Sequence, residues 1–296
     1  KNTFVRVVRE DPAKKGLLYA GTEAGMLISF NDGANWQSLK LKMPPVPITD
    51  IKIRQGDLVI ATQGRGFYVM DDIAIFSQLS NDLADKDLHV FKPSPTQMIT
   101  GRRSGGQFEG KNPPNGVLLN YYLAKENEGP LTIEILDNDG NLVRGYSSEE
   151  SDYDRCIIAN MTPRTKEEIK HPAKKQGANI WTWDMRREGI TCIPDIRFFV
   201  GFNGAKVIPG KYQARITIGD NQQIVPIELQ DDPRNDATES QYIFLNSKIV
   251  EGTNLVNEIL TDLDIVRKAR DQIKGLMTDH DQLQQSGKKA LAHIRT

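Results

Sequence analysis

The sequence lacks the features that mark several large classes of protein. No apolar run approaches the roughly 18 residues that a membrane-spanning helix needs, so no membrane span is expected. The formal net charge of −1 leaves no basic field for phosphate groups, which argues against a nucleic-acid partner. Two cysteines, Cys156 and Cys192, are too few for a disulfide scaffold or a metal cluster. They predict either one bridge in an exported protein or two separate buried thiols.

Enzyme signatures are equally scarce. The four histidines, His89, His171, His280 and His293, fall in separate segments without metal-ligand spacing, and neither cysteine has a nucleophile signature. The sequence therefore predicts no metal site and no cofactor, and the catalytic residues stay unknown.

What is present indicates a loop-rich β protein. The 296 residues include 24 glycines and 15 prolines with 38% apolar residues, enough for two or three packed domains. No signal peptide is visible, yet the chain opens in a strand-like segment at 4–8 and stops inside a helix-like one. We therefore expect a fragment, in which the missing signal says nothing about export.

The chain is organised around residues 17–36, LLYAGTEAGMLISFNDGANW. They predict two short strands and a tight polar turn that contains Ser29, Asn31, Gly33 and Trp36. Glycine supplies the backbone freedom of such a turn, and short polar side chains bond to nearby amides. We expect Trp36 to pack between sheets, so this motif is interpreted as structural and not as an ion site.

An internal repeat follows. Residues 17–28 are echoed by residues 57–69 at an offset of about 40, the period of a four-stranded propeller blade. The second copy contains Gly64, Arg65 and Gly66 before an aromatic strand. Two blades cannot close a ring, so the remainder of the propeller is expected as a partner, missing from this chain or supplied by another segment.

The segments AGTEAGMLISFNDGANW and PVPITDIKIRQGDLVIATQGRGFYVMDD resemble the final blades of secreted bacterial Asp-box propeller proteins. These are related to sortilin-type and xyloglucanase-type propellers and are often labelled glycosyl hydrolases. The closing blade of that family carries His-Gly-Arg-Gly, whereas Gln63 stands first here. The resemblance extends to residue 277 and implies an exported protein: periplasmic, cell-envelope or extracellular. With both cysteines in one β domain, it also implies a Cys156–Cys192 bridge.

A second β domain is predicted after residue 115. Its expected strands cover 116–123, 131–136, 141–146, 178–186, 209–218 and 223–229, with a polar insertion at 147–176. Short strands at even spacing favour an immunoglobulin-like sandwich. The resembled family has a fibronectin-like domain at the same place.

The last part of the chain changes to a helical pattern. A heptad-like apolar seam runs from 249 to 277, a turn is predicted at 278–281, and a second helix at 283–294. The predicted fold class is thus mainly β, with partial propeller blades, an immunoglobulin-like sandwich and a C-terminal helical hairpin that packs on itself. The predicted domains are 1–80 for the two blades, 81–114 for a connector, 115–230 for the sandwich and 231–296 for the hairpin.

Two functions are compatible with these patterns. The first is a non-catalytic exported scaffold or binding module that contacts a protein or glycan through propeller loops. The alternative is the C-terminal part of a glycoside hydrolase whose paired carboxylates lie on absent blades. Asp71, Asp72 and Glu23 lie near predicted strand ends, but the sequence does not bring any two together, and Arg65 with Tyr68 does not complete a sialidase site.

Overall fold

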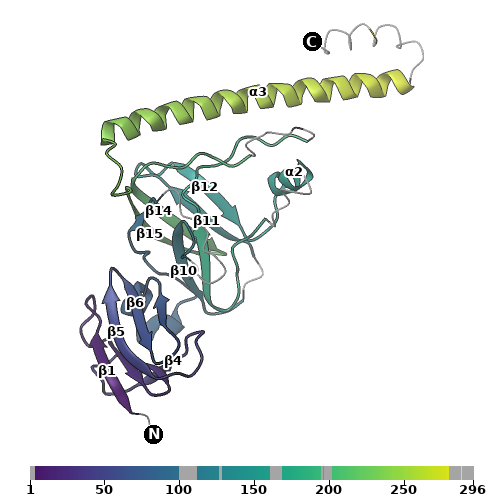
Figure 1. The fold of residues 1–296 in the computed structure, drawn as a ribbon. Helices are drawn as coiled ribbons and strands as arrows, with labels where there is room; N and C mark the ends of the chain where they lie inside the picture. Colours follow the sequence, from purple (N-terminus) through teal and green to yellow (C-terminus); the bar gives the residue numbers. More distant parts are fainter. Residues whose placement is uncertain are drawn as a thin grey trace.

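The computed structural model describes residues 4–99, 112–126, 129–160, 169–194, 196, 202–279 and 288. A four-stranded and a three-stranded sheet lie at the N-terminal end, a three-stranded and a five-stranded sheet follow them, and one long helix crosses the opposite end of the molecule (Figure 1). The fold is therefore mainly β and ends in a long helix.

The first two sheets repeat one antiparallel plan. The strands of the first are β1 (Val5–Glu10), β2 (Leu18–Thr22), β3 (Gly25–Ser29) and β4 (Gln37–Leu39). The strands of the second are β5 (Ile48–Arg54), β6 (Asp57–Thr62) and β7 (Phe67–Met70). Alternate side chains of both sheets meet in one apolar core, where Tyr19, Ile48 and Ile60 are fully buried.

The repeat extends to the turns before the second strands. Gly16 and Gly56 both have a positive φ, 79° and 86°, which favours glycine. The carbonyl of Gly16 accepts the N–H of Asp32 at 2.9 Å, and that of Gly56 accepts the N–H of Ile73 at 2.8 Å. The sequence repeat therefore corresponds to a repeat of backbone geometry.

The segment expected as a connector contributes strands to the next core. After α1 (Ala74–Gln78) and a 3₁₀ turn (Asn81–Asp85), β8 (Leu88–Val90) pairs with β10 and β9 (Thr96–Gln97) pairs with β15. Residues 100–111 of this connector lie outside the described residues.

Two sheets then enclose the second core. One has the order β13-β10-β8 and the other β12-β11-β14-β15-β9. The remaining strands are β10 (Val117–Leu123), β11 (Leu131–Leu136), β12 (Leu142–Ser147), β13 (Gly177–Trp183), β14 (Gly210–Ile218) and β15 (Asn221–Gln230). Inward residues alternate with outward ones along these strands, as in Leu119, Ile133 and Ile216, which are all fully buried. Each of the six strands expected from the sequence is present within a few residues.

The polar insertion contains a helix that the sequence did not predict. This helix, α2 (Asp152–Asn160), begins after Ser151, whose Oγ accepts the N–H of Asp154 at 3.1 Å. The Asp154 carboxylate in turn accepts the N–H of Ser151 at 2.8 Å. This reciprocal cap satisfies two free donors of the first turn and uses the acidic residues of the insertion.

The C-terminal region is one long helix in the described residues, not the predicted hairpin. Helix α3 (Glu239–Asp279) has 41 residues and a length of about 60 Å. It begins at a capping pair in which Gln241 Oε1 accepts the N–H of Thr238 at 2.8 Å. The expected turn at 278–281 is wrong at its start, because Thr278 and Asp279 are still helical. Except for Lys288, the predicted second helix at 283–294 lies outside the described residues.

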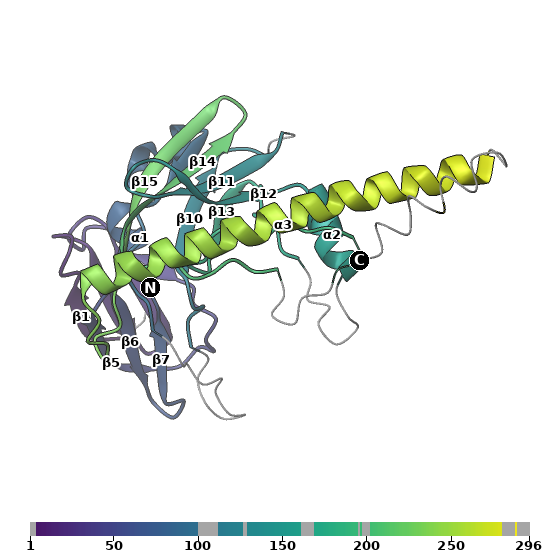
Figure 2. The same cartoon turned by 90° about the horizontal axis from the view of Figure 1, so that it is seen from above.

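Helix α3 runs across the sandwich and continues beyond it (Figure 2). Among the residues that the structure describes, no helix is long and apolar enough to cross a membrane. Because α3 extends past the sheets, the described residues support it along only part of its length.

Candidate functional site

The turn between β3 and β4 is built from its own side chains. Ser29 is fully buried, and its Oγ accepts the N–H of Gly33 at 2.9 Å while donating to Asn31 Oδ1 at 3.1 Å. The same Oδ1 accepts the N–H of Asn35 at 2.9 Å. Asn31 thus makes the acceptor bonds that an aspartate would make, without the charge.

Trp36 does not pack between sheets as expected. Its ring is 38% exposed and lies 3.6 Å from the place where a Cβ on Gly33 would be. The ring therefore covers the turn from outside.

The second turn, which contains Gly64, Arg65 and Gly66, joins β6 to β7. Both glycines have a positive φ, 86° and 68°, and the carbonyl of Gly66 accepts the Thr62 hydroxyl at 2.8 Å. The glycines explain the shape of the turn, whereas Arg65 is exposed to solvent at its tip.

Strand β7 is an outer strand of its sheet in the order β5-β6-β7. Its Tyr68 and Met70 turn toward the first core, while Phe67 and Val69 face outward with exposed fractions of 77% and 54%. An outer strand with exposed apolar side chains is a template for pairing with another strand. We call β7 with Phe67 and Val69 the β7 edge.

Two of the acidic residues considered for hydrolysis are bound to neighbouring side chains in the described structure. Glu23 Oε1 accepts the Arg6 guanidinium at 2.7 Å. The Asp72 carboxylate accepts the Ser94 hydroxyl at 2.7 Å. Both are thus engaged by neighbours, and the pocket described below is lined by none of Glu23, Asp71 and Asp72.

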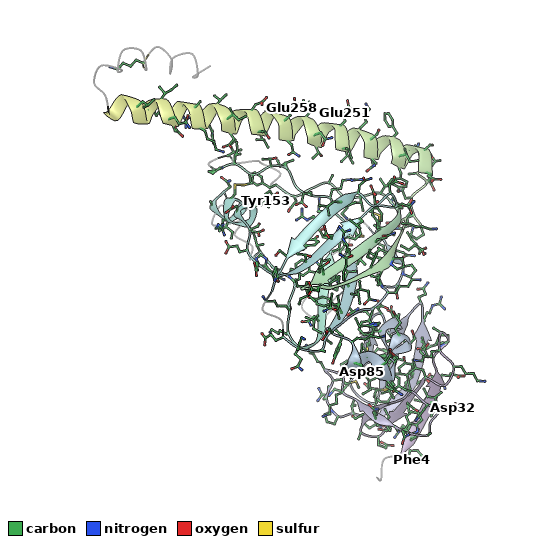
Figure 3. All side chains as sticks on the ribbon, turned by 180° about the vertical axis from the view of Figure 1, so that it is seen from behind. Phe4, Asp32, Asp85, Tyr153, Glu251 and Glu258 are labelled. Carbon is green, nitrogen blue, oxygen red and sulfur yellow. A yellow bond between two sulfur atoms is a disulfide. The ribbon has the colours of Figure 1, made fainter. Side chains whose placement is uncertain are left out.

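The predicted bridge between Cys156 and Cys192 is confirmed, with a Cα–Cα distance of 6.0 Å. It joins α2 to residues 187–194, the segment that follows β13. On α2, Asn160 donates to the Ile193 carbonyl at 3.0 Å. Tyr153, which is labelled on this helix in Figure 3, donates to the Ile190 carbonyl at 3.0 Å. The insertion is therefore fastened to residues 187–194 covalently and by hydrogen bonds.

Helix α3 is held mainly by the same segment. Arg187 donates to Asn246 at 2.6 Å, the Thr191 N–H donates to Asn257 at 2.8 Å, and Arg267 donates to the Pro194 carbonyl at 2.6 Å. These polar contacts position α3 over the sandwich, and the disulfide stabilises the segment that makes them.

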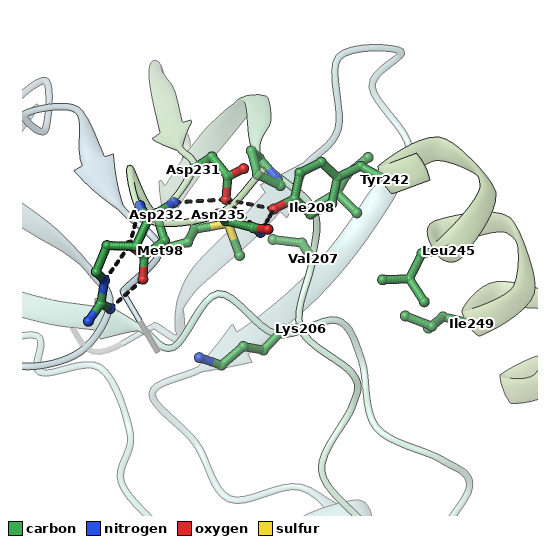
Figure 4. Close-up of a pocket in the computed structure, with 12 residues that line it drawn as sticks. Met98, Lys206, Val207, Ile208, Asp231, Asp232, Asn235, Tyr242, Leu245 and Ile249 are labelled. Carbon is green, nitrogen blue, oxygen red and sulfur yellow. Dashed lines mark hydrogen bonds and ion pairs between the residues drawn. The ribbon is translucent and has the colours of Figure 1, made fainter. Parts of the chain in front are cut away.

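A pocket of about 710 Å³ lies where α3 begins. Its apolar wall comes from Met98, residues 207–209, Leu245 and Ile249. Its polar wall comes from Lys206, Asp231, Asp232, Arg234, Asn235 and Tyr242. Tyr242 donates to the Asp231 carboxylate at 2.6 Å, and the Asn235 amide contacts both groups (Figure 4). The volume is within the usual range for small-ligand sites of about 300–1,000 Å³.

The polar wall of this pocket is held together by hydrogen bonds and one ion pair. Burial and the hydrogen bond to Asp231 raise the pKa of Tyr242 to about 12, so the phenol keeps its proton near neutral pH. Asp232 is buried and paired with Arg234 at 2.5 Å. Near neutral pH, Tyr242 therefore acts as a hydrogen-bond donor to Asp231.

No cation site is found in the described part of the chain, where no group of three or more His, Cys, Asp or Glu residues could hold a metal ion. In the polar insertion at 147–176, the carboxylate of Asp154 takes part in the cap of α2. The pocket was not predicted from the sequence, because its walls combine Met98 with residues from three later segments, 206–209, 231–235 and the start of α3.

Comparisons with known proteins add little. No protein-family model matches the chain, and no curated protein matches it. One solved structure that matches is the extracellular domain of the putative hybrid two-component system BT4673 from B. thetaiotaomicron, at 8% identity and a TM-score of 0.20. The alignment covers 78% of this chain and 26% of that one, so this chain matches about a quarter of that structure's length. At this TM-score the similarity carries no argument about function.

Proposed function

We propose that the chain is a non-catalytic binding scaffold, formed by two propeller blades, an immunoglobulin-like sandwich and a helix. The repeated antiparallel sheets with matching turns support the assignment of blades. The resemblance to exported Asp-box propellers supports the same assignment, and the disulfide is consistent with an oxidising compartment.

Two features support an immunoglobulin-like topology. The strand order of the larger sheet places β9 parallel to β15 at the end of an otherwise antiparallel sheet. Near the start of β14, the Tyr212 hydroxyl donates to the Ile208 carbonyl at 2.9 Å. A tyrosine that bonds back to the chain at this corner is a hallmark of such sandwiches.

The β7 edge is the observation that carries the binding function. Unpaired backbone groups of an outer strand bind an extended polypeptide by main-chain hydrogen bonds, and alternate side chains select its sequence. Phe67 and Val69 would contact apolar side chains of that polypeptide. A protein ligand is favoured over a glycan, because a β-strand can bind both the backbone groups of the β7 edge and its apolar side chains. The remainder of the propeller is the first candidate to supply such a strand.

Peptide display against the whole chain tests this function. We expect extended peptides with alternating apolar residues to be enriched, and the substitution Phe67→Lys to weaken their binding more than about tenfold. Leu142→Lys, at an outward position of β12 with 57% exposure, is the matched control and should leave binding unchanged.

The same preparation is screened against glycans and polysaccharides. The proposal would be contradicted if the chain bound a glycan and the Phe67→Lys variant bound it equally well. Hydrolysis of any polysaccharide would also contradict it. No observation on the described residues specifically favours the hydrolase alternative, since the acids considered for it are not paired across a pocket.

A further inference from the structure

Helix α3 carries an apolar face that the described residues leave exposed. Leu255, Ile259, Leu263 and Val266 are between 36% and 58% exposed. At about 100° per residue they lie within roughly 80° of one another around the helix axis. This set of four is called the outer face of α3.

The contacts with the sandwich use the other side of the helix. Asn246, Asn257 and Arg267 make the hydrogen bonds to residues 187–194, and Leu260 is buried between them at 4% exposure. The polar anchors and Leu260 therefore hold α3 without using its outer face. Both faces can be occupied at once.

Charge is distributed unevenly along the helix. Residues 251–264 contain four acidic and no basic side chains, and residues 265–274 contain four basic and one acidic. Glu251 and Glu258 project on the side away from the sandwich (Figure 3). Two such helices side by side in opposite directions place each acidic segment against a basic one, whereas parallel alignment places like charges together.

We propose that the outer face of α3 binds the outer face of α3 in a second copy of this chain, as an antiparallel two-fold pair. The two-fold axis passes between Thr261 and Asp262, close to the end of the acidic segment. Leu255 of one copy then lies near Val266 of the other, and Gly252 lets the two backbones approach closely.

The apolar area of the contact is that of a small interface. If each of the four side chains leaves roughly 80–100 Å² accessible, the two copies together remove on the order of 700 Å² of apolar surface from water, and the charged side chains beside them enlarge the contact. The main-chain edges of the blades take no part, so this pairing is independent of binding at the β7 edge.

Light scattering coupled to size-exclusion chromatography tests the pairing on the whole chain. The unmodified protein is expected to have the mass of a dimer at micromolar concentration. The double substitution Ile259→Glu and Val266→Glu should raise the dimer dissociation constant more than about a hundredfold and give a monomer. Ile224→Glu, on β15 at 48% exposure, is the matched control and should stay dimeric. Circular dichroism verifies that each variant is folded.

Cross-linking determines the direction. With both native cysteines in the disulfide, Asp262→Cys and Phe244→Cys each supply one reactive thiol. In the antiparallel pair, a short bis-maleimide joins the two copies at position 262, because that residue is near the axis, but not at position 244. A monomeric unmodified protein, a double variant that remains dimeric, or equal cross-linking at both positions would overturn the proposal.

Discussion

The sandwich and helix α3 use apolar side chains in opposite ways. In the sandwich, inward residues of both sheets are buried against one another, with Trp183 fully enclosed. In the part of α3 whose side chains are described, Leu260 is the one buried apolar residue, and polar contacts make the attachment. Both regions carry an apolar face, but they differ in what covers it. An apolar stripe indicates a packing surface, but the partner depends on the tertiary arrangement.

The largest effect is expected in the sandwich core. Trp183→Ala removes a ring that packs edge-to-face on Tyr212 and donates to the Arg186 carbonyl at 2.9 Å. It should lower the free energy of unfolding by about 3–5 kcal/mol, measured by urea denaturation. Trp36→Ala, at the partly exposed turn, is the matched control and should cost less than about 1.5 kcal/mol. Equal losses would mean that the two tryptophans are similarly packed.

The next effect concerns the bridge beneath α3. Replacing Cys156 and Cys192 together by serine opens a cross-link between residues 36 apart in sequence and should cost about 2–4 kcal/mol. Hydrogen exchange should accelerate in α2 and residues 187–194 before it does in β11 and β14. Uniform acceleration through the sandwich would contradict a local role for the bridge.

A smaller effect is expected where α3 begins. Thr238→Ala removes the hydroxyl that accepts the N–H of Gln241 at 3.4 Å and should cost about 1 kcal/mol. Hydrogen exchange should show fraying limited to the first turns. Ser247→Ala, whose hydroxyl bonds only within the helix in the described contacts, is the control and should leave exchange of those turns unchanged.

The smallest effect is a dependence on alkaline pH. The pKa of Tyr242 is raised from 10.0 to about 12, so the folded protein keeps a proton that the unfolded chain has lost. This contribution to stability is complete below pH 10 and is lost as pH rises from 10 toward 12. Tyr242→Phe should flatten the decrease of unfolding free energy in that window. An unchanged slope would show that Tyr242 titrates at an ordinary pKa.

Local patterns determined much of the fold. Alternation in LTIEIL located β11 at residues 131–136, and the turn at 137–140 located the return strand. The repeat of about 40 residues located the paired sheets, because turn glycines and strand alternation are both local signals. The bridge also followed, once an exported class was inferred.

Long-range features could not be predicted in this way. Strand β9 has two residues and pairs in parallel with β15 more than a hundred residues later. Helix α2 lies in a polar stretch without an apolar periodic pattern. Its start is defined by the reciprocal hydrogen bonds between Ser151 and Asp154, which the structure shows. The pocket depends on the packing of α3 over the sandwich. The turn expected at 278–281 was wrong at its start, because polar residues such as Thr278 and Asp279 are also compatible with a helix.

Hydrogen exchange of α3 at several protein concentrations tests the central claim most directly, because pairing of two copies depends on concentration whereas packing within one chain does not. We expect amides of α3 around residues 252–270 to gain protection as concentration rises, while those of β11 and β14 stay constant. Protection of α3 that is the same at every concentration would contradict the assignment of its outer face to a second copy.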